Sequence, residues 1–114
     1  GLIADLGHVC AASGVAASIA AAEVPLSDAA RAAIAREPEL LATVLSGGDD
    51  YELMFTAPPS RAGALASQAR EAGLPITRIG RIRPPDPGEA GRTVRVDDAH
   101  GRPLSLANAG FRHF

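Results

Sequence analysis

The residues best placed to do chemistry lie near the middle of the chain, in the segment Gly47-Gly48-Asp49-Asp50-Tyr51-Glu52-Leu53. The two glycines allow backbone conformations that other residues rarely adopt, and two adjacent carboxylates follow them. The aromatic and apolar run that comes next is typical of a strand. Because side chains alternate direction along an extended backbone, the two aspartates should have different roles, one facing a ligand and one facing backbone or solvent. Such a carboxylate can hold Mg²⁺, usually through water, or contact a cationic ring. The residues alone leave open a second interpretation, a solvated turn that leads into a strand.

The aromatic end of the chain supplies a second candidate for ligand contact. Phe111 follows Gly110 directly, so its ring could lie against a flat heterocycle. The alternative is that both Phe111 and Phe114 hold the tail against the core, and for Phe114 this structural role is the expected one.

The remaining polar candidates indicate no further catalytic centre. Asp5 and His8 stand three apart on an expected helix, but two such residues without a third ligand predict a surface pair. His100 and His113 have no serine or cysteine partner placed for a nucleophilic triad. Glu52 is expected to face solvent. The sequence also has neither a Walker-type loop nor a Gly-x-Gly-x-x-Gly motif that opens a helix, so the phosphate-binding parts of any nucleotide site are expected to lie elsewhere.

Composition narrows the class of protein. The chain has 114 residues, enough for one domain with a real core, and 46% of them are hydrophobic. A net charge of −2 argues against nucleic acid as a partner. No apolar run approaches the ~18 residues that a membrane span needs. Cys10 is the single cysteine, so it forms no internal disulfide and should pack as a small apolar side chain. Without a secretory signal, a cytoplasmic location is expected.

Hydrophobic spacing predicts helices that alternate with strands. The Tyr51–Thr56 strand has the strongest signal, because bulky and aromatic residues are bounded there by Gly-Gly and Pro-Pro pairs. Arg83–Gly91 is rich in proline and glycine and should be a surface loop. Helices are expected over residues 2–13, 28–36, 39–45 and, after a Ser60 cap, 61–72, and strands over 15–22, 51–56, 76–82, 93–96 and 104–106.

These elements predict an α+β fold in a single domain that covers residues 1–114. The last two strands flank a turn over residues 97–101 and should form a hairpin, which implies antiparallel pairing. We therefore expect a layered α/β/α domain with a mixed four- to five-stranded sheet, partly ferredoxin-like, rather than a purely parallel one.

Several of these segments, taken in order, resemble the C-terminal domain of bacterial thiamine-monophosphate kinase, within the aminoimidazole-ribonucleotide-synthetase-like superfamily. The resemblance extends over essentially the whole chain, and its specificity comes from the ordered set rather than from any one motif. The segments are Gly1-Leu2-Ile3-Ala4-Asp5-Leu6-Gly7-His8, Pro25-Leu26-Ser27, Ser46-Gly47-Gly48-Asp49-Asp50-Tyr51-Glu52-Leu53, Ile79-Gly80-Arg81-Ile82 and Gly110-Phe111-Arg112-His113-Phe114.

The resemblance implies an enzyme that moves the γ-phosphate of ATP directly onto thiamine monophosphate, with several Mg²⁺ ions bridging the phosphates. Such catalysis depends on positioning and charge neutralisation, so no protein nucleophile is expected. Asp49 matches the family's acidic residue that contacts the substrate. Phe111 matches the tail aromatic, which is tyrosine in many relatives, so ring stacking on thiamine is retained while a hydroxyl hydrogen bond is lost.

The resemblance also implies that this chain holds one part of a divided site. In the family, an N-terminal domain supplies most ATP and Mg²⁺ ligands and, in the wider superfamily, the homodimer interface. Of the family's Asp-x-Ser-Asp-Gly-Leu motif, the chain retains Gly1-Leu2. The resemblance therefore implies that the 114-residue chain holds no catalytic, cofactor-binding or metal-binding residue and is inactive by itself. The alternatives are the matching domain of a selenophosphate synthetase or hydrogenase maturation factor, and a non-catalytic small-molecule-binding module.

Overall fold

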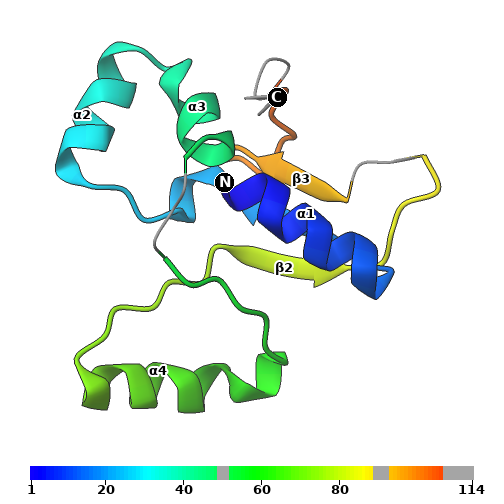
Figure 1. Cartoon of the computed structure of the whole chain (residues 1–114). Helices are drawn as coiled ribbons and strands as arrows, with labels where there is room; N and C mark the ends of the chain where they lie inside the picture. Colours follow the sequence, from blue (N-terminus) through cyan, green and yellow to red (C-terminus); the bar gives the residue numbers. More distant parts are fainter. Residues whose placement is uncertain (49–51, 89–92, 107–114) are drawn as a thin grey trace.

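A three-stranded mixed sheet organises the protein (Figure 1). The computed structural model describes residues 1–48, 52–88 and 93–106. The central strand β1 (Ala16–Ala20) pairs antiparallel with β2 (Gly80–Arg83) and parallel with β3 (Val94–Asp97). The predicted α+β class and mixed sheet are confirmed. Within the described residues the sheet has three strands rather than the four to five expected.

One face of the sheet carries the apolar core. The helix α1 (Leu2–Ser13) lies across this face and ends at Gly14, as predicted. Side chains alternate along β1, so Ala17 and Ile19 point toward α1 and are only 2% and 1% exposed. Cys10 on α1 is fully buried among them, which confirms its expected role as a small apolar side chain.

The opposite face of the sheet is polar and rich in arginine. The same alternation turns Ser18 of β1 away from α1, and the strand register places Arg81 and Arg95 beside it on the two flanking strands. Arg83 of β2 lies on this face too, and its Nε donates a hydrogen bond of 3.0 Å to the Ser18 hydroxyl. The sheet therefore has one face for the core and one face of charged side chains.

Two short helices follow β1 and lead to the glycine-rich segment. After a 3₁₀ turn (Ala21–Glu23), helix α2 (Asp28–Arg36) begins at Ser27, whose hydroxyl accepts a hydrogen bond from the Ala30 amide at 3.1 Å as a cap. Helix α3 (Leu40–Ser46) packs beside α1 and buries Leu45 completely. Both helices were predicted from the sequence with these boundaries to within one residue.

Helix α4 (Ala62–Ala72) lies apart from the sheet (Figure 1), joined to it by two extended segments. Its contacts are mainly with the 3₁₀ turn before it, Pro59–Arg61, and no α4 residue is buried. The helix itself is as predicted, although Ser60 lies within the 3₁₀ turn rather than at the cap. Because α4 is remote from the sheet, the described residues show the helices α1 and α3 on one side and no second layer that covers the arginine-rich face.

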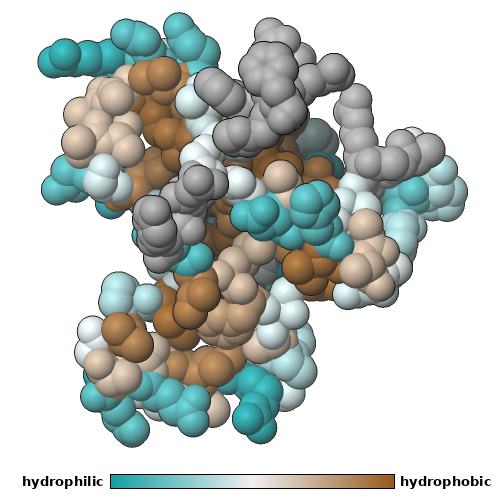
Figure 2. All heavy atoms as spheres, in the orientation of Figure 1, coloured by the Kyte–Doolittle hydropathy of each residue, from teal (hydrophilic) through white to brown (hydrophobic). Residues whose placement is uncertain are grey.

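The predicted strand over residues 51–56 is wrong for its described part. Residues 52–56 form no ladder, and they expose Leu53 by 98% and Phe55 by 59%. Tyr51 lies outside the described residues. A strand requires a neighbour to satisfy its amide and carbonyl groups, and this segment leads away from the sheet toward α4 (Figure 1). Figure 2 shows apolar surface on the lobe that contains α4, where this segment and Leu74 lie exposed.

Two further strands are shorter than predicted. The strand expected over residues 76–82 begins at Gly80, although the Ile79 carbonyl still accepts a hydrogen bond from the Ala20 amide at 2.8 Å. The second arm of the expected hairpin, residues 104–106, is reduced to a bridge between Asp97 and Pro103 and one hydrogen bond from the Leu104 amide to the Val96 carbonyl at 2.7 Å. Proline has no amide hydrogen, so a regular ladder cannot pass through position 103.

Candidate functional site

The two residues predicted to contact substrate, Asp49 and Phe111, lie outside the described residues, as do Asp50 and Tyr51. Their role therefore stays a prediction. The structure does describe the chain on both sides of the acidic pair, from α3 to Gly48 and again from the exposed Glu52 onward.

Helix α3 and the two glycines that follow it, Gly47 and Gly48, determine the direction in which the backbone reaches Asp49. The Gly47 amide donates to the Thr43 carbonyl at 2.8 Å, and the Ser46 hydroxyl donates to the Ala42 carbonyl at 2.7 Å. Gly48 then adopts a φ of +88°, a left-handed conformation that residues with a Cβ rarely take. The backbone therefore turns sharply immediately before Asp49.

The beginning of α1 meets this same turn. A Cβ placed on Gly1 would lie 2.7 Å from the Ser46 carbonyl oxygen and 3.0 Å from the Gly47 carbonyl oxygen, so only a glycine allows this approach. The contact joins two segments that are distant in the sequence, Gly1-Leu2 and Gly47-Gly48. Both belong to the motifs on which the family resemblance rests.

Other residues considered from the sequence form no catalytic group. Asp5 and His8 are both exposed, as expected for a surface pair. No group of three or more His, Cys, Asp or Glu side chains arranged for a metal ion occurs within the described parts of the chain. Burial raises the pKa of the Cys10 thiol, and the nearby Arg83 opposes this only in part, so the thiol stays protonated and unreactive at neutral pH.

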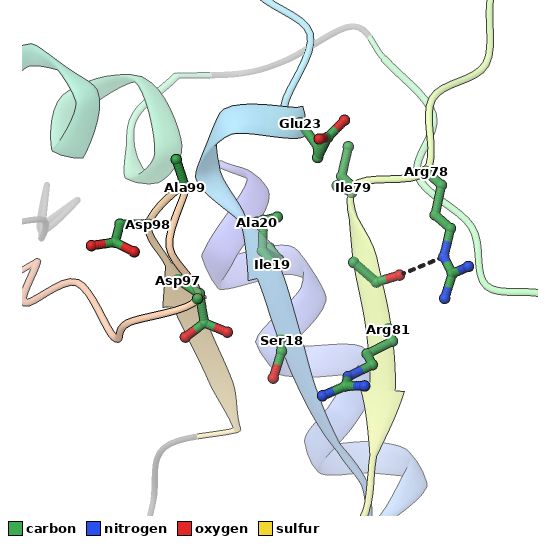
Figure 3. A pocket seen from close by; sticks show the side chains of 12 residues that line it. Ser18, Ile19, Ala20, Glu23, Arg78, Ile79, Arg81, Asp97, Asp98 and Ala99 are labelled. Carbon is green, nitrogen blue, oxygen red and sulfur yellow. Dashed lines mark hydrogen bonds between the residues drawn. The ribbon is translucent and has the colours of Figure 1, made fainter.

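The arginine-rich face of the sheet contains an open hollow of about 490 Å³ (Figure 3). It lies where β1 and β3 end and β2 begins. Ser18 and Ala20 form its floor, Arg78 and Arg81 stand on the β2 side, and carboxylates stand toward β3 and at the end of β1. The carboxylates are Glu23, Asp97 and Asp98.

Two of these carboxylates are already neutralised by neighbours. Asp97 forms an ion pair with Arg95, with Nε 2.9 Å from Oδ1, and its Oδ2 accepts a hydrogen bond from the Arg95 NH2 group at 3.2 Å. Asp98 accepts hydrogen bonds from the amides of His100 at 2.8 Å and Arg102 at 2.9 Å, and pairs with the Arg102 side chain at 3.3 Å. These hydrogen bonds, the one from the Arg102 amide foremost, lower the pKa of Asp98.

The lowered pKa of Asp98 predicts a specific pH dependence of stability. A carboxyl whose pKa is depressed by folding stabilises the protein above its unfolded pKa, and this contribution is lost as the pH falls through the folded value. Asp98→Asn keeps an accepting oxygen but removes the charge. Urea unfolding should therefore show it less stable than wild type at pH 7, with a difference that vanishes as the pH falls through the acidic range.

Asp98→Ala separates charge from hydrogen bonding. It also removes the accepting oxygen, so it should lose more stability than Asp98→Asn, and part of that loss should persist in acid. A difference between wild type and Asp98→Asn that is constant from neutral to acid pH would show that the charge of this turn contributes nothing.

Sequence reasoning missed the hollow because its lining comes from three separate segments, residues 18–23, 78–81 and 97–101. Only one local signal was available, the alternation of apolar and charged residues in Gly80–Arg83 and Val94–Asp97. Such alternation is typical of strands with one polar face. It does not indicate which strands lie side by side, and that pairing creates the hollow.

Taken together, the fold and site define a small α+β domain in which the start of a helix meets a glycine-rich turn before two aspartates. The sequence of this domain is similar to part of a known enzyme. Thiamine-monophosphate kinase from Escherichia coli K12 is 41% identical over 115 residues, which cover 100% of this chain and 33% of that protein. The corresponding kinase from Salmonella typhimurium is 38% identical over 114 residues and again matches 100% of this chain and 33% of its own length.

A solved structure that matches this chain has the same name as these sequence relatives. The crystal structure of thiamine-monophosphate kinase from Stenotrophomonas maltophilia K279a matches with a TM-score of 0.72 and 42% sequence identity, over 91% of this chain and 30% of that chain. No family model matches the sequence. The resemblance inferred from the sequence motifs is confirmed: the chain is homologous to a C-terminal part of the thiamine-monophosphate kinases and spans about a third of their length.

Among the helices of the described residues, none has the length and apolar character to cross a membrane.

Proposed function

We propose that this chain is part of an ATP-dependent kinase that phosphorylates thiamine monophosphate to thiamine diphosphate. The names of its relatives support this reaction over the two alternatives drawn from the wider superfamily and over a non-catalytic module. The proposal makes thiamine monophosphate and ATP the substrates of the whole enzyme. The cytoplasmic location and the absence of nucleic-acid and membrane partners stay predictions.

The observation that carries the proposal is the contact between Gly1 and the Ser46–Gly47 turn. In the family, the acidic motif that binds metal and nucleotide ends in Gly-Leu, which corresponds here to Gly1-Leu2. Residues that precede this glycine in the whole enzyme would therefore come close to the turn that presents Asp49. Substrate and nucleotide contacts would meet there, although they belong to segments far apart in the sequence.

Within this scheme the chain supplies one wall of the site. Asp49 would contact the substrate by charge and hydrogen bonding, and Phe111 would stack on its rings. The family resemblance, in which an N-terminal domain supplies these contacts, is the reason for placing the Mg²⁺ and most ATP ligands outside this chain. Residues 1–114 would then be the C-terminal substrate-binding domain, and an N-terminal ATP- and Mg²⁺-binding domain would form the homodimer.

Substitutions in the full-length enzyme test the two substrate contacts. Asp49→Ala removes a charged partner and should lower kcat/KM for thiamine monophosphate by roughly 10- to 100-fold, because hydrogen bonds to charged groups contribute about 1.5–3 kcal/mol. Phe111→Ala should lower kcat/KM about 3- to 10-fold through lost stacking. The measurement is steady-state kinetics with thiamine monophosphate varied at saturating ATP.

Matched variants identify the cause of any loss. Glu71→Ala removes an exposed carboxylate on α4 and should retain wild-type kinetics. Phe111→Tyr keeps an aromatic ring and should retain stacking. Wild-type KM and kcat in both alanine variants would overturn the site assignment, and measurable turnover by the purified 114-residue chain alone would overturn the divided site.

A further inference from the structure

The hollow on the arginine-rich face is separate from the turn that leads to Asp49. Its floor is formed by side chains of β1 that point away from α1, whereas Gly47 and Gly48 follow α3, which packs beside α1. The proposed kinase site uses none of the described residues that line this hollow. The hollow therefore requires its own explanation.

Some of the charged side chains that line the hollow have an ion-pair partner and others have none. Asp97 and Asp98 are neutralised by Arg95 and Arg102, as described above. Among the described residues, the guanidinium of Arg81 and the carboxylate of Glu23 have no ion-pair or hydrogen-bond partner. Arg78 has one weak bond, from Nε to the Gly80 carbonyl at 3.5 Å. Among the described residues, these two cations and one anion thus have no ion-pair partner, and together they carry a net charge of +1.

A buried hydroxyl on the floor adds an independent observation. Ser18 is only 6% exposed, and its oxygen accepts a hydrogen bond from Arg83. Among the described residues no acceptor takes the hydrogen of this hydroxyl. A buried polar hydrogen without an acceptor is costly, and one that faces an open hollow can be satisfied by a bound molecule.

We propose that this hollow binds a phosphate monoester that also carries a hydroxyl or amino group. The fork of five N–H donors on Arg81 suits phosphate oxygens, and Arg78 adds charge from the same strand end. The Ser18 hydroxyl donates to the same phosphate. Because Glu23 can accept a hydrogen bond, we expect the ligand to carry a hydroxyl or amino group at the end away from its phosphate. Figure 3 shows Arg81 and Ser18 close together on this face, with Glu23 at one end of the hollow.

The test is a titration of the 114-residue chain with glycerol phosphate, followed by amide chemical shifts in NMR spectra. Saturable shifts are expected at Ser18, Arg81 and their strand neighbours. Inorganic phosphate should bind the same residues more weakly, because it does not reach Glu23, and glycerol should not bind. Because guanidinium–phosphate contacts are charge-assisted, Arg81→Gln should weaken binding of glycerol phosphate by roughly tenfold or more.

Two variants distinguish specific binding of the ligand in the hollow from nonspecific electrostatic attraction to the protein. Arg70→Gln removes an exposed arginine from α4, remote from the hollow, and should change the dissociation constant by less than about twofold. Arg81→Lys keeps the charge but not the fork and should fall between wild type and Arg81→Gln. Arg81 is exposed, so its variants should fold, which the unchanged spectra of the free proteins will show.

The proposal would be overturned by non-saturable shifts, by equal loss of affinity in Arg70→Gln and Arg81→Gln, or by shifts centred on α4. Loss of binding in Asp49→Ala but not in Arg81→Gln would also overturn it, because the ligand would then lie at the acidic turn. The titration contains neither ATP nor thiamine monophosphate. Its failure therefore leaves the proposed kinase function standing, and failure of the kinetic test leaves this site standing.

Discussion

Gly80→Ala should destabilise the domain by about 3 kcal/mol, a large share of the roughly 5–15 kcal/mol that holds a typical domain together. Gly80 lies opposite Ile19 where β2 joins β1. A Cβ at this position would overlap the Ser18 carbonyl oxygen and lie 3.0 Å from the Ser18 carbonyl carbon and 3.1 Å from the Ile19 Cα. All three are backbone atoms of the central strand, so no side-chain rotation can relieve the overlap and the strands must separate.

Urea unfolding followed by circular dichroism measures this effect. The matched control is Gly63→Ala on α4, where an added Cβ meets nothing within 4 Å. It should leave stability unchanged or raise it by up to about 1 kcal/mol, because alanine favours helix. If Gly80→Ala unfolds at the same urea concentration as wild type, the close approach of β1 and β2 described here is wrong.

Leu45→Ala should destabilise the domain by about 2–5 kcal/mol, the usual range for deleting a buried leucine side chain. Leu45 is fully buried on α3 and belongs to the core that α1 and β1 share. It also lies two residues before Gly47, so the cavity left by the substitution would loosen the helix end that sets the direction of the acidic segment. In the full-length enzyme we therefore expect a raised KM for thiamine monophosphate as well as reduced stability.

Leu74→Ala is the control for loss of the same side chain. Leu74 is 64% exposed, so its truncation removes little buried area and should cost under about 1 kcal/mol. The two variants are compared by denaturant unfolding, and for KM under conditions where both remain folded. Equal destabilisation by the two substitutions would show that Leu45 is not part of the core that α1 and β1 share.

Elements that are specified by local sequence were predictable. The helices expected over residues 2–13, 28–36 and 61–72 are present; the Ser27 hydroxyl caps α2, and Gly14 and Gly73 end α1 and α4 with left-handed φ values of 66° and 67°. Capping and spacing operate within a few residues, so a single sequence contains the information. The same is true of β1, which lies within the strand predicted over residues 15–22, although it is shorter and ends at Ala20.

Elements that depend on a partner distant in the sequence were not predictable. The run from Leu53 to Phe55 has the composition of a strand, but composition cannot supply the neighbour that a ladder needs. The residues of the hollow illustrate the same limit, because register between β1, β2 and β3 brings Ser18, Arg81 and Arg95 to one face. For the acidic turn, the sequence motif indicated a site, while the contact of Gly1 with Ser46 and Gly47 became visible only in three dimensions.

The parallel pairing of β1 with β3 has a consequence for synthesis on the ribosome. Ala17 of β1 pairs with Val94 of β3, and the hydrogen bond from Arg83 of β2 to Ser18 of β1 spans 65 positions. β1 is therefore made long before either neighbour exists. At 5–20 residues per second this delay is on the order of ten seconds, during which the central strand has no ladder partner. Nascent chains that end before about residue 80 should consequently remain unfolded, and dependence on chaperones should be greatest in that interval.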